Sequence, residues 1–117
     1  MRLLAAILLI VTALNPAFAE DHSEAYYQHL LCDGVGKMEY RLQDGTRVDC
    51  LTETHAWEVD FQHKWAEAFG QAMHYARMTG REPAVLLVGD NADKYAGRII
   101  ALTKAHEIRI LVVTVKP

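Results

Sequence analysis

The clearest alternation of apolar and polar side chains lies in residues 55–61, which read HAWEVDF. A period of two residues is typical of a β-strand that turns one face toward a core. Residues 62–78 instead place apolar side chains at helical spacing, and Thr79-Gly80 is a helix-ending signal. The middle of the chain therefore predicts a strand followed directly by a strong helix.

The rest of the pattern predicts a mixed sheet with helices packed on it. The expected elements are a helix over 20–31, strands over 37–42 and 47–52, a buried strand over 84–88, a helix over 92–106 and a strand over 108–115. Asp44-Gly45 is a hairpin signal between the first two strands. The order αβββαβαβ predicts an α/β fold (α+β, mixed sheet), with a three-strand antiparallel meander and crossover helices.

Two groups of apolar residues are predicted to be buried. The strand over 55–61 and the helix after it are expected to supply the centre of the core, namely Trp57, Val59, Phe61, Trp65 and Phe69. The first helix offers a second apolar group, namely Ala25, Tyr26, Leu30 and Leu31.

Residues 1–19 have the pattern of a signal peptide. Met1-Arg2 is a short basic start, Leu3 to Leu14 is apolar but too short to span a bilayer, and Ala17-Phe18-Ala19 resembles a cleavage site. We therefore expect residues 20–117 to form one exported domain, periplasmic or secreted, with no membrane segment after cleavage. An uncleaved anchor or a buried N-terminal helix is the alternative.

The charge balance is acidic. The whole chain has a formal net charge of −3, and removal of Arg2 with the signal peptide lowers it by one more unit. This balance counts against tight, sequence-independent binding of nucleic acid, which depends on Lys and Arg. It does not exclude a nuclease, because a bound cation neutralises the acids of a metal site.

The chain contains two cysteines, Cys32 and Cys50. In an exported protein an even count favours a disulfide, here from the first helix to the second strand. Such a bridge would stabilise the fold by about 3 kcal/mol in the chain-entropy model. Two buried free thiols are the alternative, and no His lies at the short spacings of a zinc site.

Three acids are placed to converge on one part of the predicted sheet. Glu58 and Asp60 share one face of their strand, and the hairpin brings Asp49 beside them. Carboxylate oxygens are the ligands that Mg²⁺ and Mn²⁺ prefer, and acids facing a sheet neighbour are unfavourable unless they are paired or bound to metal. The three residues are therefore candidate metal ligands.

Three further candidates fall on one stripe of the following helix, at the border of its buried face. They are Lys64, Gln71 and Tyr75. Such a position lets polar groups lie near the sheet and still meet solvent. The alternative is structural, with a lysine stem packed on the surface, a half-buried ring and a glutamine that caps a backbone group.

These residues resemble motifs of the PD-(D/E)XK nuclease superfamily, notably its branch with a Gln-x-x-x-Tyr motif, which reads QAMHY over residues 71–75. The αβββαβ order is similar to the core of that superfamily over most of residues 22–90. Residues 39–76, with EYRL, DGTRVDCLT, DF and KW, also resemble a small family of exported bacterial proteins. The resemblance implies a restriction-endonuclease-like core.

The resemblance also implies roles for individual residues. Asp49 and Glu58 would be metal ligands, with Gln71 and Tyr75 contacting substrate or ordering the site. The motif lysine would stand at position 60, where this chain has Asp60. A lysine on the adjoining helix can replace it, and Lys64 is placed to do so.

The expected function is that of an exported, metal-dependent nuclease or phosphodiesterase that uses Mg²⁺ or Mn²⁺ and acts on nucleic acid or another phosphodiester. A homodimer would help so small a domain to span a duplex. The alternative is a non-catalytic periplasmic domain that keeps the nuclease-like fold for binding or structure. A toxin- or immunity-type binding module is a third possibility.

Overall fold

The computed structural model describes residues 22–117, so the expected signal peptide lies outside the described residues. The elements are α2 (Glu24–Cys32), β1 (Lys37–Arg41), β2 (Arg47–Leu51), β3 (His55–Phe61), the 3₁₀ turn η1 (Gln62–Lys64), α3 (Trp65–Thr79), β4 (Glu82–Val88), α4 (Ala92–His106) and β5 (Leu111–Val115). This order confirms the predicted αβββαβαβ succession. The largest difference in bounds is at the first helix, which begins at Glu24 and not at residue 20, and the last strand begins three residues later than the pattern suggests.

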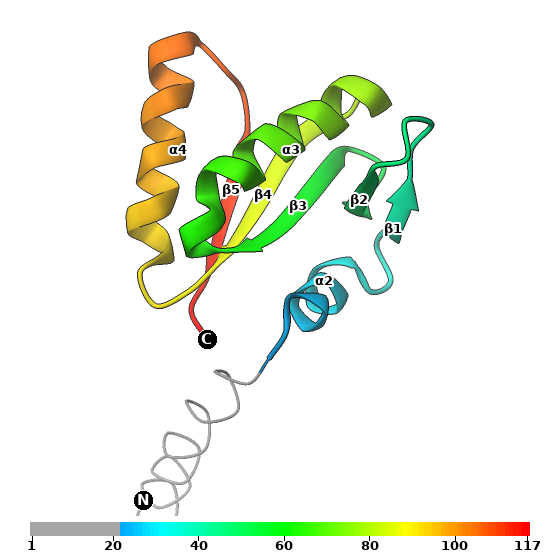
Figure 1. The fold of residues 1–117 in the computed structure, drawn as a ribbon, viewed down its shortest axis with the longest axis horizontal. Coiled ribbons are helices and arrows are strands. Elements are labelled where there is room, and N and C mark those ends of the chain that lie inside the picture. Colours follow the sequence, from blue (N-terminus) through cyan, green and yellow to red (C-terminus); the bar gives the residue numbers. More distant parts are fainter. Residues whose placement is uncertain (1–21) are drawn as a thin grey trace, which may run out of the picture.

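The five strands form one mixed sheet in the order β1-β2-β3-β4-β5. The first three strands pair antiparallel, as the hairpin signal predicts, and β3, β4 and β5 pair parallel. Each parallel connection passes through a helix, α3 or α4 (Figure 1). The middle strand of the sheet is β3, and its neighbour β4, which lies between two parallel strands, is buried from Pro83 to Val88.

The core has two main layers, one on each face of the sheet. Trp57 and Val59 point to the face on which α2 packs, and Phe61 borders that layer. Trp65 and Phe69 border the opposite layer, under α3 and α4. The prediction of a single core centre made of these five residues was therefore wrong, because the strand and the helix contribute to different layers.

The buried face of α3 consists of small residues and one tyrosine. Ala68, Ala72 and Tyr75 are its buried side chains, whereas Trp65 and Phe69 are only partly buried. Alanines let the helix axis approach the sheet closely, which leaves the large rings on the flank toward α4. The helix ends at Gly80, whose φ of 71° gives the left-handed conformation expected from the Thr79-Gly80 signal.

The disulfide between Cys32 and Cys50 is present and confirms the predicted pairing, with Cα atoms 5.6 Å apart. It fixes which side of α2 faces the sheet, so Tyr27, Gln28 and Cys32 are buried. The predicted apolar face of this helix was wrong, since Tyr26 is 40% and Leu30 62% exposed.

Gly36 is required beside this disulfide. A Cβ atom at this position would lie 2.9 Å from Cys50 Sγ and 2.8 Å from the carbonyl oxygen of Leu51. Only glycine therefore lets the chain pass this closely over the bridge.

None of the helices in residues 22–117 is both long and apolar enough to cross a membrane.

Candidate functional site

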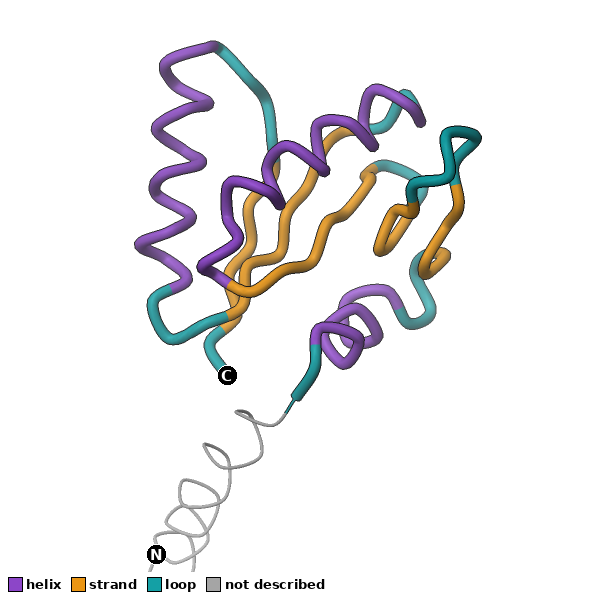
Figure 2. The backbone as a smooth tube through the Cα atoms, in the orientation of Figure 1, coloured by secondary structure: helices purple, strands orange, loops and turns teal. Residues whose placement is uncertain are grey.

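The pairing of β2 with β3 ends early, and the candidate acids lie at that point. Cys50 pairs with Trp57 and Leu51 with Ala56, but the next residues along do not pair. Figure 2 shows β2 beside only the beginning of β3. The next opposed pair would be Asp49 and Glu58. Asp49 Oδ2 instead accepts a hydrogen bond from the backbone N–H of Val59, at 2.7 Å.

The three predicted ligands are buried and form no ion pair within the described residues. Asp49 is 7%, Glu58 4% and Asp60 6% exposed. Within residues 22–117 the ion pairs join Arg47 to Glu39 and His74 to Asp44, so neither involves these three acids. A buried carboxylate without a cationic partner is unfavourable. The group must therefore hold protons or a cation.

Asp49 and Glu58 form a coupled carboxyl pair. Burial, followed by the charge of the adjacent Asp49 carboxylate and a hydrogen bond with it, raises the pKa of Glu58 to about 10. Burial also raises the pKa of Asp49, to about 6, although the hydrogen bond from Val59 opposes this rise. At neutral pH without metal, the pair therefore retains one proton.

A second carboxyl pair joins α2 to β3. Burial, together with the charges of Asp60 and Asp49 and a hydrogen bond with Asp60, raises the pKa of Glu24 to about 7. The pKa of Asp60 is raised by burial, against hydrogen bonding from Phe61 N–H and the charge of Lys64. Sequence reasoning missed Glu24. Its spacing of eight residues from Cys32 places it on the side of α2 that the disulfide turns toward the sheet.

Gln71 and Tyr75 both contact Glu58, as the predicted stripe of α3 requires. The Gln71 amide nitrogen, oriented toward the acid, donates to Glu58 Oε1 at 2.9 Å and Oε2 at 3.1 Å. Burial raises the pKa of the Tyr75 hydroxyl, and the charges of Glu58 and Asp49 and a hydrogen bond with Glu58 add to it. The two side chains therefore hold the Glu58 carboxyl group in place.

An open notch of about 400 Å³ borders the first carboxyl pair. Its lining residues come from α2, the β1–β2 hairpin, β3 and α3, and they are Glu24, Gln28, Glu39, Gly45, Thr46, Arg47, Asp49, Glu58, Gln71 and Tyr75. The structure thus brings together Asp49, Glu58, Gln71 and Tyr75 from the predicted site. Asp60 and Lys64 are not part of this lining.

Lys64 is the last residue of the 3₁₀ turn and the N-cap of α3, and it does not lie on the helix itself. The prediction that Lys64 shares a helical stripe with Gln71 and Tyr75 was therefore wrong, because the 3₁₀ turn η1 precedes α3. The side chain is exposed and makes no ion pair within the described part of the chain. Its positive charge nevertheless lowers the pKa values of Asp60 and Glu24 against the stronger effect of burial.

The donor set suits a hard divalent cation with two protein ligands. Among residues 22–117, no three His, Cys, Asp or Glu side chains are grouped so that they could hold a metal ion. Asp49 and Glu58 are adjacent oxygen donors at an open notch, and Mg²⁺ is commonly held by one or two carboxylates with water in its other positions. The pair therefore fits Mg²⁺ or Mn²⁺, while a joint role for Asp60 stays a prediction.

A hydrogen bond from α3 to the β1–β2 hairpin braces the rim of the notch. His74 Nε2 lies 2.6 Å from Asp44 Oδ2, and Asp44 Oδ1 accepts from the backbone N–H of Thr46 at 3.0 Å and from its hydroxyl at 2.6 Å. These hydrogen bonds, those from Thr46 first, lower the pKa of Asp44 to about 2. The hairpin and the helix therefore keep a fixed spacing at this rim.

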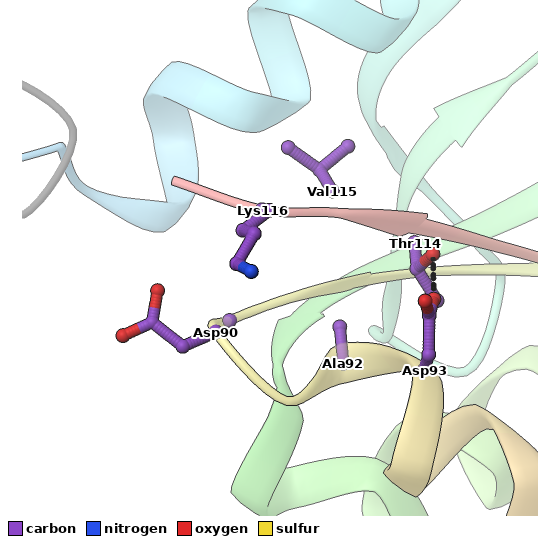
Figure 3. Close-up of a pocket in the computed structure, with 7 residues that line it drawn as sticks. Asp90, Ala92, Asp93, Thr114, Val115 and Lys116 are labelled. Atoms are coloured by element: carbon purple, nitrogen blue, oxygen red, sulfur yellow. Dashed lines mark hydrogen bonds between the residues drawn. The ribbon is translucent and has the colours of Figure 1, made fainter. Parts of the chain in front are cut away.

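A smaller hollow of about 180 Å³ lies where β4 and β5 end and α4 begins (Figure 3). Thr114 Oγ1 donates to Asp93 Oδ1 at 2.5 Å, so these two side chains satisfy each other. Asp90 and Lys116 lie at its outer rim. This hollow lacks the buried carboxyl pair that distinguishes the notch beside Asp49.

Comparisons of the chain with protein-family models, with curated proteins and with solved structures gave no significant match.

Proposed function

We propose that this protein is a metal-dependent phosphodiesterase of the nuclease type, with its centre at Asp49 and Glu58. One observation carries the proposal, namely a pair of buried carboxyl groups without a cationic partner that opens onto a 400 Å³ notch. A divalent cation can replace the proton that the pair otherwise retains, because metal ligation requires deprotonated carboxylates.

The roles of the residues follow from their contacts. Asp49 and Glu58 would hold Mg²⁺ or Mn²⁺, Val59 N–H fixes the orientation of Asp49, and Gln71 and Tyr75 fix that of Glu58. When bound, such an ion supplies an activated water and neutralises charge on the phosphate. These restraints hold both carboxylates in place before any substrate arrives.

The exposure of Lys64 favours an enzyme over a protein in which the acids and Lys64 form a structural cluster of ion pairs. A purely structural lysine would lie within about 4 Å of the acids it neutralises. Lys64 is instead exposed and unpaired in the described part of the chain, next to Asp60 and Glu24, whose pKa values respond to it. We propose that its ammonium contacts the phosphate of a bound substrate, in place of the lysine that the superfamily motif would have at position 60.

The rival function is a non-catalytic domain, and one observation favours it. The acidic cluster consists of four acids that already have hydrogen-bonding partners, because Asp49 pairs with Glu58 and Glu24 with Asp60. A protein that keeps these protons permanently would need no cation. The two functions therefore differ in whether a divalent cation displaces protons from the cluster.

Export, a restriction-endonuclease-like core and a homodimer remain part of the proposal. The Cys32–Cys50 disulfide supports export, because such bridges persist in oxidising compartments. The succession αβββαβ of the described elements supports the core that the motif resemblance implies.

The direct test is cleavage of single-stranded and duplex DNA and RNA by residues 20–117 with Mn²⁺ or Mg²⁺. The proposal requires metal-dependent cleavage of at least one substrate, abolished in Glu58→Gln and retained in Glu53→Gln. Glu53 is an exposed acid in the turn before β3 and makes the same charge change. No cleavage by the wild-type protein on any substrate would favour the non-catalytic rival.

A further inference from the structure

Arg98 on α4 lies within cation–π distance of two aromatic rings at the junction of α3 and α4. Its guanidinium carbon lies 4.8 Å from the ring centre of Tyr95 and 5.6 Å from that of Trp65. Lys94, one turn earlier, lies 6.0 Å from the ring centre of Tyr95. We call these four residues the α3–α4 surface. Both rings are partly exposed, and both basic side chains are exposed.

The two positive charges of the α3–α4 surface are unpaired within residues 22–117, because the ion pairs there involve other residues. The nearest acid along α4, Asp93, accepts a hydrogen bond from Thr114 and is directed to β5. Glu67, on the first turn of α3, is the other acid of this neighbourhood. An acidic protein therefore displays a local basic and aromatic surface.

This surface is connected to the acidic cluster through η1. Gln62 Oε1 accepts a hydrogen bond from the backbone N–H of Asn91 at 2.7 Å, which joins η1 to the start of α4. Lys64 follows in η1, and its charge reaches Asp60 and Glu24. Trp65 comes next in the chain. Figure 1 shows α3 beginning beside α4. Basic side chains are therefore present from Arg98 on α4 to Lys64 on η1, whose charge acts on Asp60 and Glu24.

We propose that the α3–α4 surface binds single-stranded nucleic acid and guides it, past Lys64, toward the acidic notch. The guiding role rests on the proposed function, whereas the binding of a single strand to this surface does not depend on it. The Arg98 guanidinium can donate its N–H groups to a phosphate, and the exposed parts of the Tyr95 and Trp65 rings can contact a base. Lys94 adds a second phosphate contact.

The chemistry favours a single strand over a duplex. Stacking needs unpaired bases, whereas duplex binding depends on many Lys and Arg contacts to phosphates. Two basic residues, joined by Lys64 and His63 on η1, are too few for a duplex of high charge density. The same exposed rings can receive bases from either DNA or RNA.

The test is fluorescence anisotropy with labelled 12-nucleotide oligo-dT and oligo-U in EDTA at low salt, so that no cleavage is involved. Arg98→Gln should weaken binding by about fivefold or more, since a stacked base contributes about 1–3 kcal/mol. Lys104→Gln is the matched control, because Lys104 is exposed in the last turn of the same helix. It should change binding less than about twofold. Lys94→Gln is the second variant, in case Arg98→Gln does not fold.

Equal binding by the Arg98→Gln and Lys104→Gln proteins would overturn the proposal, as would absence of oligonucleotide binding by the wild-type protein. Preference for a duplex over single strands would overturn the single-strand assignment. Binding of Mn²⁺ by the same proteins separates the two proposals. Arg98-dependent binding without any Mn²⁺ site would retain this surface and reject the phosphodiesterase centre. A Mn²⁺ site with Arg98-independent binding would do the reverse.

Discussion

Asp49 Oδ2 accepts a hydrogen bond from the backbone N–H of Val59 at 2.7 Å, where a β-sheet carbonyl would otherwise be. This contact spans the point at which β2 stops pairing with β3. It satisfies a buried backbone donor and at the same time fixes the carboxylate next to Glu58. The Asp49 side chain thus replaces a hydrogen bond of the sheet, and the acidic site lies where the β2–β3 pairing ends.

The stability of the metal-free protein is expected to fall as pH rises from about 5 to about 9. Asp49 and Glu58 have folded-state pKa values of about 6 and about 10, above their usual 3.8 and 4.5. The folded state therefore binds more protons than the unfolded state in this window, and stability decreases with pH. The free energy of unfolding should drop by at least about 2 kcal/mol. Urea denaturation measures it.

Saturating Mg²⁺ should flatten this pH dependence, because the cation replaces the protons. Glu58→Gln supplies the matched variant and should also flatten it. A free energy of unfolding that stays constant or increases over the same range without metal would contradict the account of the carboxyl pair.

The two core layers predict unequal effects of truncation. Ile99 is fully buried between α4 and the sheet, so Ile99→Ala should lower the free energy of unfolding by about 2–5 kcal/mol. Phe69→Ala should have a smaller effect, because its ring is partly exposed on the flank of α3. Guanidinium denaturation of the two variants compares them. A larger loss for Phe69→Ala would show that the phase of α3 is wrong.

The disulfide is expected to stabilise the fold and to position Glu24. The double variant Cys32→Ser, Cys50→Ser should lose about 3 kcal/mol of stability for a bridge that spans 18 residues. A reducing agent should lower the melting temperature of the wild-type protein and leave that of the variant unchanged. Two free thiols in protein purified from an oxidising compartment would refute the pairing.

Lys64→Met separates a functional lysine from a structural one. If the ammonium contacts substrate, the change should lower phosphodiesterase activity about a hundredfold or more, with unchanged Mn²⁺ binding. Stability should change little, because the side chain is exposed and unpaired in the described residues. Activity and melting temperature are measured on the same preparation. A loss of stability without a loss of activity would assign Lys64 to the scaffold.

The sequence alone predicted the strands well because their signals are local. The alternation in residues 55–61, the Asp44-Gly45 turn and the glycine after Thr79 each determine structure over a few residues. The disulfide also followed from the even cysteine count and the expectation of export. These features are sufficient for the succession of elements and for the mixed sheet.

The arrangement of the site depended on contacts that no local pattern contains. Glu24 reaches Asp60 because a disulfide eight residues further along orients α2. Lys64 left the predicted stripe because a 3₁₀ turn precedes α3. The face of α2 was assigned wrongly for the same reason, since apolar content favoured Tyr26 and Leu30 whereas the covalent bridge turned them outward.

The central claim is that Asp49 and Glu58 together bind a divalent cation, and calorimetric titration with Mn²⁺ tests it most directly. The wild-type protein should bind with release of protons, seen as a heat that depends on the ionisation enthalpy of the buffer. Asp49→Asn should abolish binding yet keep the fold, because its amide oxygen can still accept from Val59. Glu53→Gln should bind as the wild type does. Equal Mn²⁺ binding by wild type and Asp49→Asn, or none by the wild type, would contradict the claim.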